Sequence, residues 1–286
     1  RISRLDFSED FRALYALSEH ESIWGAVSRA VRTPYWGQEY VQIHQEWRAA
    51  GCVPQIPTLP CSIVVQGDPQ SQPEKINTFE VGYRTRPTDK TALDVSAFAS
   101  RGRQFQSLDI NPAQIAVTPT YITLPLQFGS ASAATTKGVE GTLEWQVKQG
   151  FRMRFGSSWF WESYENFPTA LPAALQNPAY EREFAEVKHS YYDRVTPRWS
   201  SFVRGSHDWN NLTLDWTVRH FGSLPRYYSA YTVADLRLGW QATKDLELSL
   251  AFANLGTGKR SEFGVQWFVA PTQVEPEWSL KAKWYF

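Results

Sequence analysis

Apolar and polar residues alternate along most of this chain. Leu246, Leu248 and Leu250, for example, alternate with the polar residues Glu247 and Ser249. Successive side chains of a β-strand point to opposite faces, so a period of two predicts strands with one apolar and one polar face. The same alternation is clear in the segments 75–85, 93–100, 139–147, 212–219 and 234–241.

The alternating segments predict about eleven strands. They are expected near 8–17, 22–32, 74–86, 91–101, 136–147, 151–162, 196–207, 212–221, 231–242, 245–254 and 275–286. No segment approaches the ~18 consecutive apolar residues that a membrane helix needs, and the mean hydropathy is −0.42. The pattern therefore predicts an all-β, antiparallel fold.

The predicted connections alternate between short and long. Short ones fall near 18–21, 87–90, 148–150, 208–211 and 243–244, and long ones near 34–72, 102–135, 162–195 and 256–272, with a modest exception at 225–230. A transmembrane β-barrel has this arrangement, with tight periplasmic turns and large outer loops. Soluble sandwiches and barrels lack such regularity. The fold is therefore predicted to be an antiparallel transmembrane β-barrel.

Composition agrees with a membrane barrel. Aromatic residues make up 15 % of the chain, and there are 13 tryptophans. Membrane proteins place tryptophan at the two boundaries between lipid and water. The formal net charge is zero at pH 7, so no charge excess points to nucleic acid. No HExxH, GxSxG, P-loop or GxGxxG signature is present, so neither a cofactor nor a metal is predicted.

The odd strand count suggests that the barrel continues beyond this chain. Single-chain bacterial barrels carry an even number of strands, and about eleven strands match the second half of a barrel of about 22. Residues 1–286 are expected to be one domain, part of that barrel, and the piece alone is expected to misfold. The alternative is a complete channel of about ten to twelve strands, in which residues 13–16 would pair with 281–284.

The chain ends in an aromatic residue preceded by an apolar stripe. Trp278, Leu280, Ala282, Trp284 and Phe286 occupy every second position up to the end. A terminal phenylalanine after such a stripe resembles the signal read by the barrel-assembly machinery. These residues are therefore expected to form that signal and to face the lipid of the outer membrane.

Two cysteines, Cys52 and Cys61, lie nine positions apart in a proline-rich segment. In an exported protein such a pair is expected to form a local disulfide. Closing so short a ring stabilises the fold by roughly 2–3 kcal/mol. The alternative is a pair of free thiols. A metal site is disfavoured because no histidine or second cysteine pair stands at ligand spacing.

Four segments, with the terminal phenylalanine, resemble TonB-dependent receptors. Ser28–Pro34 (SRAVRTP) resembles a strand end, SRxxRxP, that enters a large outer loop, and Pro73–Tyr83 resembles PExxxxxExGY. Thr136–Glu140 (TKGVE) resembles the start of a later strand, TxGVE. Ala253–Leu255 resembles the xNL block of the penultimate strand, although Gly256-Thr257 replaces the usual Phe-Asp. The segments occur in the family's order and span essentially the whole chain.

The resemblance implies an importer in the outer membrane of a Gram-negative bacterium. Such receptors take up scarce, bulky ligands such as ferric siderophores, cobalamin or similar chelates. TonB supplies the energy through an N-terminal plug inside the barrel. The sequence contains neither the plug nor the first half of the barrel, so transport is expected of the parent protein.

Ligand contacts are expected in the outer loops and on the upper lumen wall. The candidates are aromatic and cationic residues: Tyr35, Trp36, Tyr40, Trp47, Arg48, Trp161, Tyr164, Arg226, Tyr227 and Tyr228. Their alternative role is an aromatic girdle or packing within the loops. Charged strand residues should pair within the lumen or contact the plug; these are Glu80, Arg84, Asp94, Glu140, Glu144, Asp215, Arg219, Asp235 and Arg237.

An outer-membrane enzyme is the weakest alternative. Some barrels carry Asp/His sites, for which Asp215 or Asp235 with His207 or His220 would be the candidates. The alternation places Asp215 and His220 on opposite faces of one strand, which argues against such a pair. The chain is therefore predicted not to be an enzyme.

Overall fold

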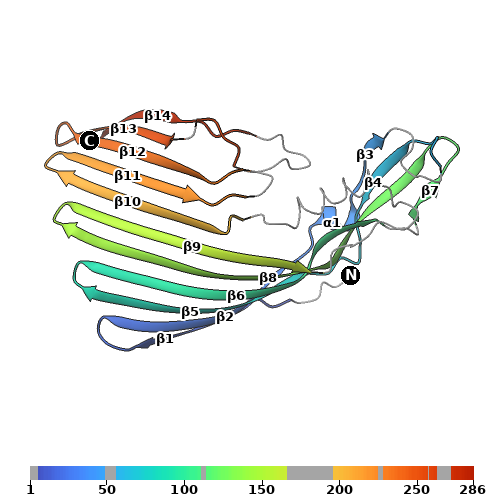
Figure 1. The fold of residues 1–286 in the computed structure, drawn as a ribbon, viewed down its shortest axis with the longest axis horizontal. Coiled ribbons are helices and arrows are strands. Elements are labelled where there is room, and N and C mark those ends of the chain that lie inside the picture. Colours follow the sequence, from blue (N-terminus) through green and yellow to red (C-terminus); the bar gives the residue numbers. More distant parts are fainter. Residues whose placement is uncertain are drawn as a thin grey trace.

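One large, mostly antiparallel sheet organises the protein (Figure 1). The computed structural model describes residues 6–48, 56–110, 114–165, 196–224, 228–256, 258–262 and 272–286. Within these ranges 14 strands join the sheet, and the helix α1 (Trp36–Tyr40) has five residues. No helix in this part of the chain is long and apolar enough to cross a membrane. The predicted all-β class is confirmed.

Eleven strands follow one another across the sheet, each antiparallel to the next. They are β1 (Glu9–Ala16), β2 (Glu21–Arg32), β5 (Glu74–Thr88), β6 (Thr91–Ile110), β8 (Ile122–Lys148), β9 (Phe151–Glu165), β10 (Trp199–Trp209), β11 (Leu212–Phe221), β12 (Tyr231–Gln241), β13 (Leu246–Leu255) and β14 (Glu277–Trp284). The alternating segments of the sequence therefore predict both the number and the order of these strands.

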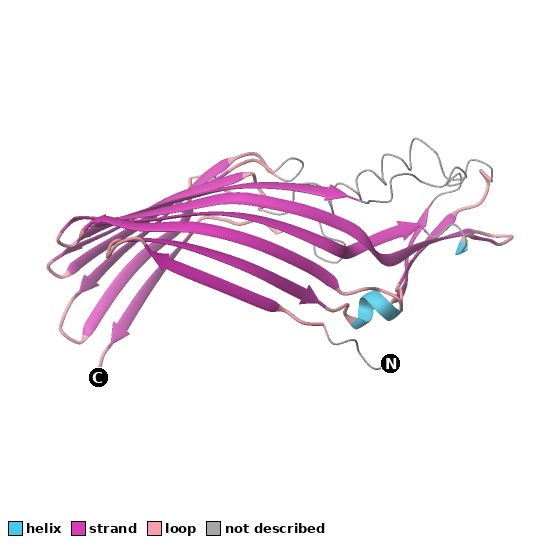
Figure 2. Cartoon of the chain, turned by 90° about the horizontal axis from the view of Figure 1, so that it is seen from below, coloured by secondary structure: helices cyan, strands magenta, loops and turns pink. Residues whose placement is uncertain are grey.

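Both edges of this sheet are open. Among the described strands, β1 pairs only with β2 and β14 pairs only with β13. A complete small channel would require residues 13–16 to pair with 281–284, and this pairing does not occur. Figure 2 shows the result, an arched sheet that forms part of a barrel wall.

The connections at one end of the sheet are all short. This end lies at the left of Figure 1, where β1 joins β2, β5 joins β6, β8 joins β9, β10 joins β11 and β12 joins β13. Gly150 and Asn210 have positive φ values of 74° and 49° in two of these turns. Glycine and asparagine tolerate that conformation best, which is why tight hairpin turns use them. The predicted short connections are therefore confirmed.

One predicted loop, 102–135, is wrong. β6 continues to Ile110 and β8 already begins at Ile122, so the two strands form a long hairpin that extends to the right of the other strands in Figure 1. Three further strands, β3 (Gln42–Arg48), β4 (Cys61–Gln66) and β7 (Ala116–Val117), lie in the predicted loops. β4 pairs in parallel with β8, and Cys61, Val64 and Ile122 are at most 1 % exposed there. β3 and β4 show no regular alternation, but Ile122, Leu124, Leu126 and Phe128 occupy every second position of β8, so the sequence did carry a period-two signal for the start of this strand.

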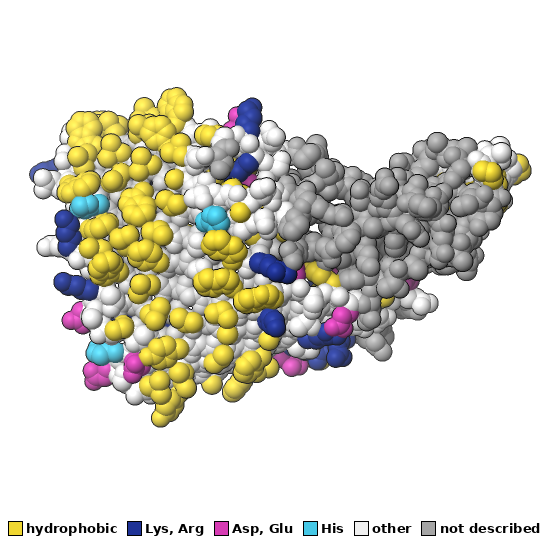
Figure 3. Space-filling view, viewed as in Figure 1, with side chains coloured by type: hydrophobic (Ala, Val, Ile, Leu, Met, Phe, Trp, Pro, Cys, Tyr) yellow, Lys and Arg dark blue, Asp and Glu magenta, His cyan; other side chains and the backbone are white. Residues whose placement is uncertain are grey.

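The register gathers apolar side chains on one face of the sheet. Directly opposed residues of neighbouring strands share a face. Leu238, Leu250 and Leu280 lie side by side on one face, while Ser249 lies beside Lys281 on the other. We call the first the lipid face and the second the lumen face. Figure 3 shows the broad band of hydrophobic side chains on the lipid face, which is the convex side of the arch in Figure 2.

Large apolar side chains on the lipid face have no protein cover. Trp278 is 70 % exposed and Leu280 is 71 % exposed. A soluble protein rarely leaves so extensive an apolar surface open to water, whereas hydrocarbon covers it at no cost. Trp278, Leu280, Ala282 and Trp284 share this face with the paired residues of β13. The alternation of the terminal stripe is confirmed, and its reading by the assembly machinery stays a prediction.

The two faces should respond differently to one added charge. Leu250→Arg places a cation against hydrocarbon and is expected to lower the free energy of unfolding by about 2–4 kcal/mol. Ser249→Arg, one residue away on the lumen face, should cost well under half as much. Denaturant unfolding in lipid vesicles of the complete barrel that contains these strands measures both losses. Equal losses would contradict the assignment of the faces.

Candidate functional site

A cavity of about 700 Å³ lies at the end of the sheet away from the short turns. Arg32 of β2, Thr136 of β8 and Tyr164 of β9 line it, and their register places them on the lumen face. Tyr35 and Trp36, which begin the first long connection, close it from the other side. The cavity therefore lies at the outer mouth of the lumen, between the sheet and this connection.

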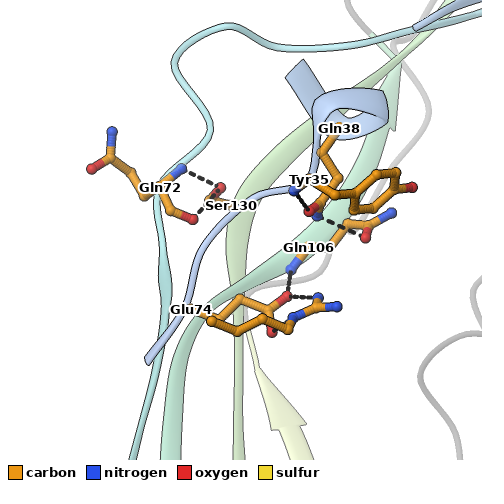
Figure 4. A network of polar contacts seen from close by, with 7 residues as sticks. Tyr35, Gln38, Gln72, Glu74, Gln106 and Ser130 are labelled. Atoms are coloured by element: carbon orange, nitrogen blue, oxygen red, sulfur yellow. Dashed lines mark hydrogen bonds and ion pairs between the residues drawn. The ribbon is translucent and has the colours of Figure 1, made fainter. Parts of the chain in front are cut away.

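A chain of polar contacts holds α1 against the sheet (Figure 4). At the end of β2, Arg32 forms an ion pair with Glu74 at the start of β5, with Nε and Oε2 2.8 Å apart. The backbone N–H of Gln106 donates to the same carboxylate at 3.0 Å. The side-chain N–H of Gln38 donates to Oε1 of Gln106 at 2.7 Å. The side-chain oxygen Oε1 of Gln38 accepts from the backbone N–H of Tyr35 at 3.1 Å. The first connection is thus fixed to β2, β5 and β6.

Further bonds support the same connection. The backbone N–H groups of Gly67 and Asp68 donate to the carbonyl oxygens of Val41 and Gln38, at 2.7 and 2.8 Å. Across the rim, the backbone N–H of Gln72 donates to Oγ of Ser130 on β8 at 2.8 Å (Figure 4). The cavity wall is therefore preorganised from both ends of the connection, which lowers the cost of binding.

Aromatic rings make up much of the wall. Tyr35 and Trp36 contribute from the first connection, Phe105 and Phe128 from the β6–β8 hairpin, and Tyr164 from the end of β9. Among the lining residues, the charged ones are Arg32 and Glu74, and they neutralise each other. Such a wall suits the apolar or aromatic surface of a ligand, with amide and hydroxyl groups available at its edge.

Tyr164 provides a neutral hydroxyl at this site. It lies beyond Trp161, at the end of β9 and outside the apolar band, and its hydroxyl donates to Oε2 of Glu162 at 3.2 Å. Burial, with the nearby carboxylate of Glu162, raises the pKa of Tyr164 to about 12. The phenol therefore stays protonated at neutral pH.

A second hollow, of about 410 Å³, lies on the lumen face nearer to β11 and β12. Tyr228 and Tyr231 line it, with their ring centroids 5.3 Å apart. Arg260 lies over the ring of Tyr231, 5.0 Å from its centroid, and pairs with Glu262 at 2.6 Å. Burial, followed by the charge of Glu262, raises the pKa of Tyr228.

The structure divides the predicted ligand-binding residues. Tyr35, Trp36 and Tyr164 meet in the first cavity, and Tyr228 lies in the second. Two others do not join them. Tyr40 is 68 % exposed and lines neither, while Trp161 has the register of the lipid face, where it fits the aromatic girdle. Arg226, Tyr227 and the side chains of Trp47 and Arg48 lie outside the described part of the chain.

Most of the predicted lumen charges pair with one another. Arg84 pairs with Asp94 at 2.5 Å, and Arg219 with Asp235 at 2.8 Å. Arg237 joins Asp215 at 3.0 Å and Glu247 at 2.5 Å, while Glu144 lies 3.5 Å from Arg154. For Glu80 and Glu140 the structure gives no ion pair with a described residue. Exposed pairs such as these stabilise a fold by roughly 0–1 kcal/mol each.

The histidines stand apart from the lumen carboxylates. His220 stacks on Trp199 with centroids 4.4 Å apart, on the lipid face, and its Nδ1 lies 2.8 Å from Oγ1 of Thr232. Asp215 points to the lumen face and contacts Arg237. The predicted separation of Asp215 and His220 is therefore confirmed. Within the described ranges, no group of three or more histidine, cysteine, aspartate or glutamate residues could hold a metal.

Cys61 is disulfide-bonded and completely buried at the start of β4. The only other cysteine of the sequence is Cys52, which lies outside the described residues. A bridge to Cys52 would close the segment that precedes β4. The pairing itself stays a prediction.

Sequence reasoning missed the polar groups that build the rim. Arg32 and Glu74 belong to the two segments, Ser28–Pro34 and Pro73–Tyr83, that carry the family resemblance, yet nothing in either segment alone shows that they meet. Gln106 was missed because the predicted strand ends at 101. The two segments lie on predicted strands that follow each other in the sequence. Pairing these strands as neighbours would have placed Arg32 opposite Glu74.

Removing the Glu74 carboxylate should loosen α1. Glu74→Gln breaks the ion pair with Arg32, and amide hydrogen exchange at Gln38, whose N–H donates to the carbonyl oxygen of Tyr35, is expected to speed up several-fold. Asp94→Gln, which breaks the lumen pair with Arg84, is the control and should leave that exchange unchanged. Unchanged exchange in Glu74→Gln would show that the ion pair does not hold the helix.

The comparisons with known proteins agree with this geometry. A family model described as TonB dependent receptor-like, beta-barrel matches residues 4–255. A mutant of the ferric enterobactin receptor PfeA from Pseudomonas aeruginosa, solved with enterobactin, is similar with a TM-score of 0.69 at 17 % identity, over 97 % of this chain and 40 % of that one. The siderophore receptor PirA from Acinetobacter baumannii is similar with a TM-score of 0.67 at 15 % identity, over 98 % of this chain and 41 % of that one.

The fold is not tied to one cargo. The copper transporter OprC is similar with a TM-score of 0.60 at 14 % identity, over 96 % of this chain and 40 % of that one. No curated protein matches the sequence. The chain spans about 40 % of the length of these solved structures. On the family match and the sheet that accompanies it, the chain belongs to the TonB-dependent receptors and forms part of their outer-membrane β-barrel.

Proposed function

We propose that this chain forms the C-terminal half of the barrel of a TonB-dependent importer. The two open edges of the sheet support this assignment, because strands in lipid need partners on both sides. The coverage of about 40 % of the solved receptors leaves room for further strands and a plug. The other half of the wall, of about eleven strands, would close the barrel.

The cavity at the lumen mouth is the observation that carries a binding function. It is preorganised by Arg32, Glu74 and Gln38, and its aromatic wall has no net charge among the described residues. The cargo we propose is a ferric siderophore, a cobalamin-like compound or a similar bulky chelate. Two of the similar structures are a ferric enterobactin receptor and a siderophore receptor, which supports this class without selecting one member.

Energy would come from TonB through a plug inside the lumen. A hollow of about 670 Å³ at the short-turn end of the lumen face is lined by Arg152 and Arg204. Neither forms an ion pair with a described residue. Acidic groups of a plug would find partners here, which accounts for cations left unpaired in a region of paired charges.

Uptake under iron limitation tests the proposal. The receptor is expressed in a Gram-negative strain without its own siderophore receptors and is supplied with a panel of ⁵⁵Fe-loaded siderophores. Tyr35→Ala and Trp36→Ala remove aromatic wall from the cavity and are expected to weaken binding of the transported siderophore at least about tenfold. Tyr40→Ala, in the same connection but outside the cavity, is the matched control.

Two outcomes separate import from passive flow. Loss of TonB should abolish accumulation and leave binding intact, because energy is needed only for release into the periplasm. Accumulation that persists without TonB would support a passive channel instead. Equal binding by Trp36→Ala and Tyr40→Ala would remove the cavity from the ligand site.

A further inference from the structure

The charges at the lumen mouth cancel one another. Among the described residues that line the first cavity, Arg32 is the one cation and Glu74 is the one anion. They are joined twice: Nε of Arg32 lies 2.8 Å from Oε2 of Glu74, and Nη2 contacts Oε1. The remaining lining residues are aromatic, aliphatic or glycine, or carry neutral hydroxyl and amide groups. A ligand in the cavity therefore meets a described wall without net charge.

The structure fixes Glu74 as the partner of Arg32. The side chain of Glu74 is 12 % exposed and that of Arg32 is 60 % exposed, so the guanidinium group is the more accessible of the two. The backbone N–H of Gln106 holds the carboxylate from another side, at 3.0 Å. A guanidinium group that already holds a carboxylate through two bonds attracts a second anion only weakly, because the two charges cancel at a distance. Arg32 is therefore a poor anchor for an anionic ligand.

The lumen wall next to the cavity offers mainly neutral hydroxyl groups. Directly opposed residues of β1, β2, β5, β6, β8 and β9 form one row there, which consists of Asp10, Ser28, Thr78, Ser100, Thr136 and Glu162. The hydroxyl groups of Thr78 and Ser100 are hydrogen-bonded at 2.8 Å. Glu162 accepts from the neutral hydroxyl of Tyr164 at 3.2 Å. The row therefore adds negative charge and no cation.

Acids also outnumber cations in the next two rows toward the short turns. Glu80 and Glu140 lie one and two rows further inward, and neither forms an ion pair with a described residue. Arg12 lies in the row of Glu80 and is already bonded to the aspartate of the preceding row at 2.9 Å. Arg198, just before β10, is opposite Phe160 and lines neither cavity. This part of the described wall thus carries more negative than positive charge.

Five further cations near the outer ends of β2 to β8 do not change this balance. They have the register of the lipid face: Arg29, Lys75, Arg101, Arg103 and Lys137. The sheet separates their charges from the cavity, so their number does not make the lumen mouth basic.

A chelate without net charge suits this wall. Three hydroxamate anions cancel the charge of one ferric ion, so a ferric trihydroxamate is neutral, whereas three catecholate dianions leave three negative charges on the complex. Moving such an anion out of water without compensating cations is unfavourable. The volume of about 700 Å³ is in the range that small-molecule ligands occupy. Charge therefore separates two classes of ferric chelate that the size of the cavity alone does not.

We propose that the first cavity selects a neutral ferric chelate of the trihydroxamate class, and that Glu74 sets this selection by masking the charge of Arg32. The inference rests on the proposed import function and narrows its cargo. The rings of Tyr35 and Trp36 would contact the uncharged surface of the chelate. Removing the charge of Glu74 would expose a cation and open the site to anionic chelates.

Equilibrium binding to the purified complete receptor tests this selection. The probes are two ⁵⁵Fe-loaded compounds, the neutral trihydroxamate ferrichrome and the anionic triscatecholate ferric enterobactin. The unmodified receptor should bind ferrichrome at least about tenfold more tightly, because the described wall has an excess of acids. The variants are compared by the ratio of the two affinities, in which a general loosening of the site cancels.

Three variants break the same ion pair and differ in charge. Glu74→Gln leaves a free cation, Arg32→Gln leaves a free anion, and R32Q/E74Q leaves neither. The relative affinity for ferric enterobactin should rise at least about fivefold in Glu74→Gln, fall in Arg32→Gln and stay within about twofold of the unmodified value in the double variant. Added salt should shrink the rise in Glu74→Gln, because screening weakens the attraction.

Asp94→Asn is the matched control. It frees Arg84 on the same lumen face near the short-turn end. The ratio should stay within about twofold, because salt screens a charge that lies roughly 25 Å along the strand from the level of the cavity. If Glu74→Gln does not show the heat-modifiable migration of a folded barrel, E80Q/E140Q is measured instead. This variant removes two acids without breaking an ion pair between described residues and should also raise the relative affinity for ferric enterobactin.

Three results would overturn the proposal. The first is equal or tighter binding of ferric enterobactin by the unmodified receptor. The second is an unchanged ratio in Glu74→Gln, or the same rise in Arg32→Gln or Asp94→Asn. The third is binding of neither probe. Accumulation of another siderophore of the uptake panel would then reject this selection alone, whereas accumulation of none would contradict the import function itself.

Discussion

In hydrocarbon a backbone N–H or C=O group without a partner costs several kcal/mol, because lipid offers no hydrogen bonds in exchange. Every other feature of this structure depends on that constraint. It requires each membrane strand to pair along its length, and β2, β5, β6 and β8 to β13 have neighbours on both sides. It also makes the outer sides of β1 and β14 the least stable places in the sheet. The same constraint that explains the long, regular strands therefore requires further strands at both edges.

Pairing also fixes which side chains face which medium. Once Leu250 is opposite Leu238 and Leu280, the period of two also carries Leu236, Phe252 and Trp278 to the lipid face. The lumen face receives the charges, and most of them pair. The candidate binding residues lie where the strands leave the membrane. There Arg32 and Glu74 fasten the first connection over an aromatic cavity.

The sequence predicted the part of the fold that lipid controls and failed where lipid is absent. Alternation located all eleven transmembrane strands and the faces of Asp215 and His220, because a charged side chain that faces hydrocarbon destabilises the barrel. The hairpin beyond Arg101 and Thr135 was mistaken for a loop because residues 129–134 of β8 are only Gly, Ala and Ser, although residues 122–128 do alternate. Tyr35, Trp36 and Tyr164 could be proposed from residue type, but Gln38 and Gln106 enter the site only through contacts between distant segments. Trp161 shows the limit of residue type alone, since its register places it on the lipid face.

The central claim is that this open sheet is one half of a closed barrel. Reading the coding DNA immediately upstream of Arg1 tests it most directly. The account predicts an uninterrupted frame that encodes a plug and about eleven further alternating strands, which would pair with both β1 and β14. A signal peptide directly before Arg1 would contradict it, because the edges would then have no partners in the same chain.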